Sequence, residues 1–422
     1  MEHTDPGHTK DVKSHTELIL INISGPDRSG ITADLTSILA RYEAEILDIG
    51  QADIHHALSL GILFKTDSRK SGDILKELLF KTTDLNVKVQ FSIVSPEEYD
   101  AWVNRQGKDR YIITLLGRRI TAAQISAVAS VITSQGLNIE TITRLTGRMP
   151  LDEMEQPLTK GCIELSVRGT PTDKEEMQKS FMELSNNLNF DISLQEDTMY
   201  RRSRRLICFD MDSTLIRTEV IDELADRAGV GPEVRAITES AMRGEIDFRE
   251  SFKRRVELLK GLDVSVMQEI AESLPITEGV GRMMEVLKRS GYKTAILSGG
   301  FTYFGEYLQR KFGFDYVYAN ELEVDEDGKL TGRYVGDIVD GQRKKELLRL
   351  LAQVEKIDIA QTIAVGDGAN DLPMLGEAGL GIAFHAKPKV KAEASQSIST
   401  IGIDGVLYFL GFKDSFMQKT KS

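Results

Sequence analysis

The sequence has almost no cysteine, no long apolar run and no excess of positive charge. Cys162 and Cys208 are the only cysteines among 422 residues, and each lies in an apolar, strand-like run. Although one disulfide between them is possible, we expect two buried thiols in a reducing compartment. The N-terminus carries acids and no apolar signal segment, and no apolar stretch approaches the roughly 18 residues of a membrane span. We therefore predict a cytoplasmic protein without membrane contact.

The balance of charges is acidic. The chain carries 65 Asp and Glu against 53 Lys and Arg, a formal net charge of -12, which argues against a nucleic-acid-binding surface. A small phosphorylated substrate is still compatible, because a metal ion and a few cations can dominate one pocket. With 41% hydrophobic and 28% charged residues, the chain is expected to form two or three globular domains.

Two copies of a β-α-β-β-α-β pattern follow a polar tail at 1–15. The copies span 16–97 and 108–197, and each alternates strand-like and helix-like segments in the order of the ferredoxin-like plan. A basic run at 201–205 follows them. In an acidic chain such a run favours a solvated linker, which we place at 198–205.

The turn after the first strand of the first copy, Gly25-Pro26-Asp27-Arg28-Ser29-Gly30, resembles the strand-to-helix turn of ACT domains. The resemblance implies regulation by L-serine or another amino acid bound near Gly25, Asp27 and Gly30, where backbone amides favour a carboxylate. The glycines could equally serve only a tight turn. The second copy has no Asp in its turn, so ligand binding, scaffolding and pairing all stay open for it. Because ACT modules usually pair, a homodimer is expected.

Two acids mark the end of an apolar strand near residue 209. Asp210 and Asp212, spaced i and i+2, would enter the crevice where open α/β sheets bind ligands. One carboxylate there can attack phosphorus while the other handles the proton of the leaving group. A second strand, 293–297, runs into Ser298-Gly299-Gly300, whose hydroxyl and amides can hold phosphate oxygens.

Two further motifs complete the series. Lys344 opens a helix at 344–354 and could offset negative charge in the same pocket. A third strand, 362–365, runs into Gly366-Asp367-Gly368-Ala369-Asn370-Asp371, which offers the hard oxygen ligands that Mg²⁺ prefers. Each motif alone also suits an ordinary turn, but four in this order predict phosphoryl chemistry.

These motifs resemble those of the haloacid dehalogenase superfamily, and 206–411 is similar along its length to the phosphoserine phosphatase family. The resemblance implies an α/β fold, with a Rossmann-like core, a parallel sheet and an inserted helical cap at about 217–275, followed by a tail at 412–422. It further implies roles for particular residues. These are Asp210 as nucleophile and Asp212 as acid and base; Mg²⁺ on Asp210, Asp367 and the Asp212 carbonyl; phosphate on Ser298, Gly299 and Lys344; Asn370 at the substrate; and Asp371 orienting waters and Lys344.

Four helices are predicted for the cap, at 221–228, 232–242, 248–259 and 264–273. The resemblance implies that Glu219 pairs with the ammonium of the substrate and Arg255 with its carboxylate, while Met242 and Phe248 line an apolar side. The neighbouring basic residues, Lys253 and Arg254, leave the choice of arginine to that resemblance.

The reaction implied by the resemblance is hydrolysis of O-phospho-L-serine to L-serine and phosphate, the last step of L-serine biosynthesis. Three alternatives stay open from the residues alone. The phosphoryl group could pass to another alcohol such as homoserine, the substrate could be another small phosphorylated metabolite, or the chain could be a non-catalytic amino-acid sensor.

Overall fold

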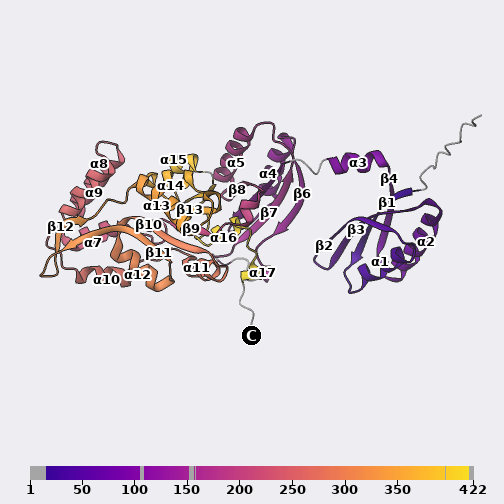
Figure 1. Ribbon diagram of the computed structural model, residues 1–422, viewed down its shortest axis with the longest axis horizontal. Helices are drawn as coiled ribbons and strands as arrows, with labels where there is room; N and C mark the ends of the chain where they lie inside the picture. Colours follow the sequence, from indigo (N-terminus) through magenta and orange to yellow (C-terminus); the bar gives the residue numbers. More distant parts are fainter. Residues whose placement is uncertain (1–15, 105–108, 152–155, 157, 395, 418–422) are drawn as a thin grey trace, which may run out of the picture. The chain divides into compact units, whose positions relative to one another are not determined.

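The computed structural model describes residues 16–104, 109–151, 156, 158–394 and 396–417 (Figure 1). The chain divides into two compact units, 1–107 and 108–422. The expected tail at 1–15 and the end of the C-terminal tail, 418–422, lie outside the described residues. Within the described ranges, no helix is long and apolar enough to cross a bilayer.

The first unit is a four-stranded antiparallel sheet of order β2-β3-β1-β4 with two helices on one face. Alternate residues of β3, including Leu58, Leu60 and Ile62, pack against those helices, as expected for a strand with one buried face. The β-α-β-β-α-β order is confirmed. Its elements are β1 (Thr16–Pro26), α1 (Ile31–Arg41), β2 (Glu45–Ile54), β3 (Ala57–Asp67), α2 (Ser68–Asp84) and β4 (Lys88–Val94), followed by α3 (Pro96–Asn104).

The second unit contains a seven-stranded sheet of order β12-β11-β10-β9-β13-β14-β15. All neighbouring strands are parallel except β12, which pairs antiparallel with β11. Of these seven strands β9 comes first in the sequence, and it lies in the middle of the sheet. The strands are β9 (Leu206–Phe209), β10 (Lys293–Phe301), β11 (Tyr316–Val324), β12 (Leu330–Val335), β13 (Thr362–Gly366), β14 (Leu380–Phe384) and β15 (Gln396–Ile398).

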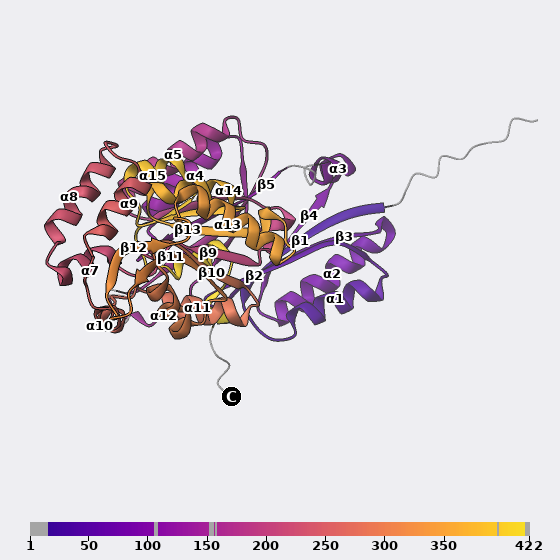
Figure 2. The ribbon, with the colours of Figure 1, turned by 60° about the vertical axis from the view of Figure 1, so that its left-hand side comes forward.

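Helices cover both faces of this sheet, as Figure 2 shows for α13 and α14 on one side and α11 and α12 on the other. Successive residues of β9 serve the two faces: Ile207 and Phe209 belong to one core, Leu206 and Cys208 to the other. Both cysteines of the chain are buried and unbridged, as predicted. The covering helices are α11 (Val280–Arg289), α12 (Thr302–Phe312), α13 (Gly341–Val354), α14 (Leu372–Glu377) and α15 (Pro388–Glu393).

A helical insertion separates β9 from α11, which confirms the predicted cap. Two antiparallel chain crossings join it to the core: the Arg217 amide donates to the Pro275 carbonyl over 2.8 Å, and the Thr277 amide donates to the Leu215 carbonyl over 3.0 Å. These crossings are the two connections between cap and core, and together they are called the hinge below. The cap helices are α7 (Val220–Ala228), α8 (Gly231–Met242), α9 (Phe248–Glu257) and α10 (Ser265–Ser273).

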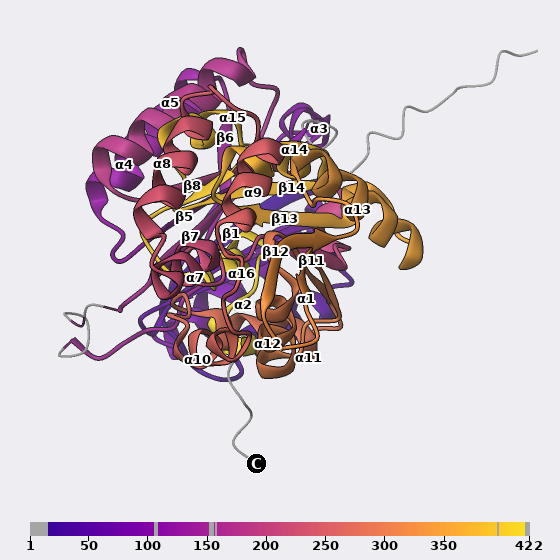
Figure 3. The ribbon, with the colours of Figure 1, turned by 90° about the vertical axis from the view of Figure 1, so that its left-hand side faces the viewer.

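The second ferredoxin-like module has sheet order β6-β7-β5-β8, with α4 and α5 side by side on one face (Figure 3). Unlike the first module, it buries its other face too, because Leu116 and Cys162 belong to the same hydrophobic core as residues of the seven-stranded sheet. This shared core explains why the module and the sheet form one unit. Its elements are β5 (Arg110–Gly117), α4 (Ala122–Ser134), β6 (Asn138–Arg144), β7 (Gly161–Arg168), α5 (Lys174–Leu188) and β8 (Asp191–Glu196).

The segment at 198–205, expected as a solvated linker, is partly buried. It contains α6 (Met199–Arg202), and Arg201 and Arg204 are only 7% and 5% exposed. The Arg201 guanidinium lies 2.6 Å from the Glu164 carboxylate, and Arg204 donates to the Gln195 side chain over 2.9 Å. The solvated interpretation is wrong for these two arginines, because polar partners on the neighbouring module compensate their burial.

The chain beyond residue 411, expected as a tail, also packs as far as the structure describes it. Helix α17 (Asp414–Met417) follows α16 (Gly405–Phe409), and its Asp414 carboxylate accepts from the Gly147 amide over 2.7 Å and from the Arg282 guanidinium over 2.7 Å. Residues 412–417 therefore belong to the folded unit.

Candidate active site

The predicted motifs meet where β9, β10 and β13 end side by side. Since neighbouring parallel strands point the same way, their carboxyl ends bring Asp210, Ser298 and Asp367 to one edge of the sheet. A cavity of about 720 Å³ opens above this edge and reaches under the cap. The predicted residues that line it are Asp210, Asp212, Glu219, Phe248, Arg255, Gly299, Asp367 and Asn370. Three further predicted residues, Ser298, Lys344 and Asp371, lie fully buried beneath it.

Hydrogen bonds and one ion pair fix both the backbone amide and the carboxylate of Asp210. Its amide donates to the Val365 carbonyl over 2.9 Å, and one carboxylate oxygen, Oδ1, lies 2.8 Å from Lys344 Nζ and accepts from the Met211 amide. Burial raises the pKa of this carboxyl well above its usual range, Asp371 raises it further, and Lys344 opposes the shift. With Oδ1 engaged, the second oxygen is the one available for attack on a ligand in the cavity.

Asp212 has a different environment. Its carboxylate accepts from the Val220 amide at the start of α7 over 3.1 Å and makes no ion pair among the described residues. Burial raises its pKa well above the usual range, and the nearby charges of Glu219 and Asp210 add to the effect. A carboxyl group with a raised pKa suits proton donation at neutral pH.

Three carboxylates form a cluster that could hold a cation. Oxygens of Asp210, Asp367 and Asp371 lie within 4.8 Å of one another. Burial, reinforced by Asp371, raises the pKa of Asp367 to about 7, so a bound cation would relieve the cost of ionising it. Hard oxygen donors fit a divalent ion such as Mg²⁺.

Asp371 acts within this cluster by positioning its neighbours. One of its oxygens accepts from Lys344 Nζ over 2.7 Å and the other accepts from the Gly368 amide over 3.0 Å. Because both oxygens are already engaged, Asp210 and Asp367 are the better candidates for metal ligands. The Thr214 hydroxyl lies 3.2 Å from Asp367 Oδ1 and orients that carboxylate.

The Ser298-Gly299-Gly300 segment is fixed by hydrogen bonds at the end of β10. The Ser298 hydroxyl accepts from the Gly300 amide over 2.9 Å. The amide of Asn320, a residue 2% exposed on β11, donates to the Gly299 carbonyl over 2.8 Å, and its oxygen accepts from the Val339 amide. Sequence reasoning missed Asn320, for which the only signal was a lone amide side chain in an otherwise strand-like run.

Lys344 lies in the first turn of α13 and is completely buried. Burial alone would lower the pKa of its ammonium, but the charges of Asp210 and Asp371 outweigh burial and raise it. The lysine is therefore a fixed positive charge beneath the carboxylates, ready to offset the charge of an incoming phosphoryl group.

The cap contributes two side chains of opposite charge to the cavity, Glu219 and Arg255. Burial raises the pKa of Glu219, whose carboxylate accepts from the Ser213 hydroxyl over 2.8 Å. Arg255 lines the cavity and donates to the Ser251 carbonyl and, at 3.5 Å, to the Thr238 hydroxyl. The neighbouring Arg254 instead turns to Glu250 on the exposed surface.

Phe248 and Met242 were both predicted to line the apolar side of the cavity. The Phe248 ring lies over Gly299, where an added Cβ would meet its Cζ at 3.0 Å. The side chain of Met242 lies outside what the structure describes. Sequence reasoning also missed three residues that line the cavity: Thr238 on α8, Lys387 just before α15, and Lys389 on α15.

The three residues expected to hold a regulatory amino acid lie together at the β1–α1 turn of the first unit. An added Cβ at Gly25 would come within 2.9 Å of Val87 Cγ1, and Gly30 has a φ of +95° at the start of α1, so both positions favour glycine. The Asp27 amide donates to the His56 carbonyl over 2.8 Å. Gly25 also lines a hollow of about 440 Å³.

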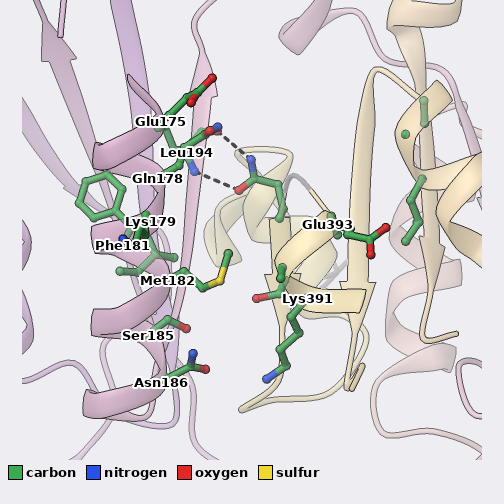
Figure 4. Close-up of a pocket in the computed structure, with 18 of the residues that line it drawn as sticks. Glu175, Gln178, Lys179, Phe181, Met182, Ser185, Asn186, Leu194, Lys391 and Glu393 are labelled. Carbon is green, nitrogen blue, oxygen red and sulfur yellow. Dashed lines mark hydrogen bonds between the residues drawn. The ribbon is translucent and has the colours of Figure 1, made fainter. Parts of the chain in front are cut away.

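A second large cavity, about 750 Å³, lies between α5 and the segment that includes α15 and β15 (Figure 4). None of the motif residues lines it. The side-chain oxygen of Gln396 accepts from the backbone amide of Leu194 over 3.0 Å. Its side-chain nitrogen donates to the Leu194 carbonyl over 2.8 Å, so the side chain pairs with β8 as the backbone of a neighbouring strand would. The cavity therefore marks the junction of two modules and lies apart from the predicted catalytic residues.

Comparison with known proteins supports the same division of the chain. Models of the ACT domain match 17–92 and 110–195, and the model of haloacid dehalogenase-like hydrolases matches 204–379. The chain is 39% identical to a phosphoserine phosphatase of Streptomyces coelicolor over 94% of its own length and 93% of the relative. It is 38% identical to phosphoserine phosphatase SerB2 of Mycobacterium tuberculosis, over 93% of each.

A solved structure agrees with these relatives. The crystal structure of a haloacid dehalogenase family hydrolase from Salmonella enterica serovar Typhi matches with a TM-score of 0.60 and 32% identity, over 71% of this chain and 98% of that one. The matches extend through both ACT modules and the hydrolase domain. The chain therefore belongs to the phosphoserine phosphatase family of haloacid dehalogenase-like hydrolases, with two ACT domains ahead of the hydrolase domain.

Proposed function

We propose that this protein hydrolyses O-phospho-L-serine to L-serine and phosphate, as the last step of L-serine biosynthesis in the cytoplasm. The observation that carries the proposal is one cavity lined by Asp210 and Asp212 on the core and by Glu219 and Arg255 on the cap. The core pair suits phosphoryl transfer, and the cap pair suits a zwitterionic amino acid.

In the proposed reaction, the Asp210 oxygen that Lys344 leaves available attacks phosphorus, and the phosphorus–oxygen bond to serine breaks. Asp212 gives its proton to the departing serine oxygen, which its raised pKa favours. Asp212 then takes a proton from a water molecule that attacks the aspartyl-phosphate, so that phosphate leaves and both acids return to their starting state.

The remaining core residues would stabilise charge. Ser298 and the Gly299 amide would hold phosphoryl oxygens together with Lys344. Haloacid dehalogenase-like hydrolases use a divalent metal, and Mg²⁺ held by Asp210, Asp367 and the Asp212 carbonyl would neutralise phosphoryl charge. Asn370 lines the same cavity and would contact the substrate.

The cap residues would select the leaving group. Arg255 presents a planar guanidinium to the carboxylate of the substrate, and Glu219 offers the opposite charge to its ammonium. Phe248 and Met242 would close the apolar side. When the cap closes over these groups, bulk water is excluded and each charge interaction strengthens.

The test is chemical quench with ³²P-labelled O-phosphoserine. Wild type should form an acid-stable, base-labile phosphoenzyme and release serine and phosphate in equal amounts, whereas Asp210→Asn should form none. Asp226→Asn, which changes an exposed cap acid paired with Arg235, is the matched control and should behave as wild type. Phosphohomoserine formed in the presence of homoserine would instead identify a phosphotransferase, and turnover by Asp210→Asn would reject the proposed nucleophile.

Regulation would come from the first ACT domain. An amino acid such as L-serine would place its carboxylate near Gly25, Asp27 and Gly30, and two chains would pair through their ACT domains as a homodimer. Sedimentation with and without L-serine tests both statements. A monomer at micromolar concentration that does not bind L-serine in equilibrium dialysis would contradict them.

A further inference from the structure

A cavity of about 380 Å³ lies at the cap hinge, where the second ACT domain meets the hydrolase domain. Five parts of the chain build it: the turn after β5, the loop after β9, the hinge crossings, the end of β14 with the loop after it, and the loop after β15. Its lining residues are Arg118, Ser213, Arg217, Thr277, Glu278, Phe384, His385, Ile401 and Gly402.

The lining carries more positive than negative charge. Arg118 and Arg217 contribute two guanidinium groups, against the single carboxylate of Glu278. Arg118 donates to both oxygens of Glu278, over 2.9 and 2.6 Å, while the Arg217 side chain has no ion pair or hydrogen bond within the described part of the chain. The guanidinium of Arg217 is therefore available to a ligand. The guanidinium of Arg118 donates two parallel hydrogen bonds, a geometry that fits any small carboxylate or phosphate.

A buried polar atom supports a ligand at this place. Thr277 is 7% exposed, and its hydroxyl has no hydrogen-bond partner among the described residues. An unpaired buried hydroxyl costs free energy unless some conformation or ligand satisfies it. Thr277 lines the cavity, so a ligand bound there can supply the missing partner of its hydroxyl.

The cavity is connected to both the cap and the reaction site. Arg217 and Thr277 lie on the two crossings of the hinge, and Glu278 follows directly. Ser213, on the wall of the cavity, follows Asp212 in sequence and donates to Glu219 over 2.8 Å. A ligand here would therefore contact the segments whose motion opens and closes the cap.

We propose that the cavity bordered by Arg118, Arg217 and Thr277 is a regulatory site for a small oxyanion, either an amino-acid carboxylate or phosphate. Bound anion accepts from Arg217 and competes with Glu278 for Arg118, so the second ACT domain loosens its hold on the hinge. The binding is independent of the proposed reaction, whereas its effect on turnover rests on that reaction.

The test is calorimetric titration of the full-length protein with Mg²⁺, using inorganic phosphate in one series and L-serine in another. Wild type should bind at least one of the two in the hinge cavity, in addition to the catalytic site and the L-serine site proposed in the first ACT domain. Arg217→Ala should weaken binding in the hinge cavity at least tenfold and leave the other sites unchanged. Arg310→Ala, an exposed arginine of α12 paired with Glu306, is the matched control. Phosphate binding lost in Arg217→Ala identifies a phosphate site, and L-serine binding lost in it identifies a carboxylate site.

Steady-state kinetics gives an independent readout. If phosphate binds the hinge, it should inhibit wild type in a mixed pattern, by lowering kcat as well as raising apparent KM, and inhibit Arg217→Ala competitively. Binding curves for phosphate and L-serine that are both identical in wild type and Arg217→Ala would overturn the proposal. Because both proteins should hydrolyse substrate without added ligand, failure of the site and failure of the proposed reaction are distinguishable.

Discussion

Lys344 Nζ lies 2.8 Å from Asp210 Oδ1 and 2.7 Å from Asp371 Oδ1, and none of its side chain is exposed. One ammonium therefore balances two buried carboxylates. Replacing it in Lys344→Ala leaves both acids without a partner, a change that costs about 3–5 kcal/mol for a buried ion pair. We expect a lower unfolding midpoint in urea and a loss of kcat of about 10²-fold or more, since the charge proposed to bind the phosphoryl group is also removed.

A matched variant separates charge from position. Lys345→Ala removes the adjacent lysine, which is 28% exposed and pairs with Glu377, 3.1 Å away. It should change stability by under about 1 kcal/mol, as expected for a surface ion pair, and leave kcat within twofold of wild type. Equal losses in the two variants would contradict a specific role for Lys344.

Gly300 lies against Asp212, the proposed acid and base of the reaction. A Cβ built at this position would overlap Asp212 Oδ2 and come within 2.8 Å of Met211 Cε. Gly300→Ala should therefore displace Asp212, and a displacement near 1 Å can lower kcat about 10²-fold. Gly376→Ala is the control, because a Cβ there meets nothing within 4 Å, and its kcat should equal that of wild type. Full activity of Gly300→Ala would show that the acid tolerates displacement.

The sequence predicted most of the hydrolase domain because its signals are local. Apolar strands that end in Asp210, Ser298 or Asp367 can be identified from their order, and parallel strands bring such ends together. Partners from distant segments carry no such signal. Asn320, which fixes the turn at Ser298, and the Arg118 contact with Glu278 depend on tertiary packing.

The same limit explains the wrong prediction at 201–205. A basic run normally favours solvent, and nothing local shows that Glu164 and Gln195 approach it from the second ACT domain. Likewise, β5 is buried on both faces and β1 on one, because residues of β5 also join the core of the seven-stranded sheet. Packing between modules, rather than local preference, decides these features.

Removal of the proposed Mg²⁺ should destabilise the hydrolase domain. Without a cation, the carboxylates of Asp210 and Asp367 repel each other in a buried site. Chelation should abolish activity and Mg²⁺ should restore it, with a stabilisation of about 2.7 kcal/mol at a concentration 100 times its Kd. Differential scanning calorimetry should show a smaller Mg²⁺ response for Asp367→Asn. Asp327→Asn, in the turn between β11 and β12, should respond as wild type does.

The pair of Arg118 and Glu278 should make stability depend on pH. The hydrogen bond from Arg118 holds the pKa of Glu278 below its usual value, so the folded state favours the ionised acid. This stabilisation is fully present at pH values above the pKa of Glu278 in the unfolded chain, about 4.3. It is lost as the pH falls through the lower pKa that Glu278 has in the folded protein. Arg118→Ala should unfold more easily at pH 7, by under about 1 kcal/mol because the pair is partly exposed, and match wild type near pH 3. An equal difference at both pH values would indicate a packing effect instead.

Arg255 should determine selectivity for the amino-acid part of the substrate. Arg255→Ala leaves the core groups in place but removes the proposed partner of the substrate carboxylate, and a lost bond to a charged group costs about 1.5–3 kcal/mol. We expect kcat/KM for O-phosphoserine to fall about 10- to 150-fold, while hydrolysis of p-nitrophenyl phosphate changes less than threefold. Arg254→Ala, which removes an exposed guanidinium bonded to Glu250, should affect neither substrate. Equal losses for both substrates in Arg255→Ala would place its contribution in cap stability rather than in recognition.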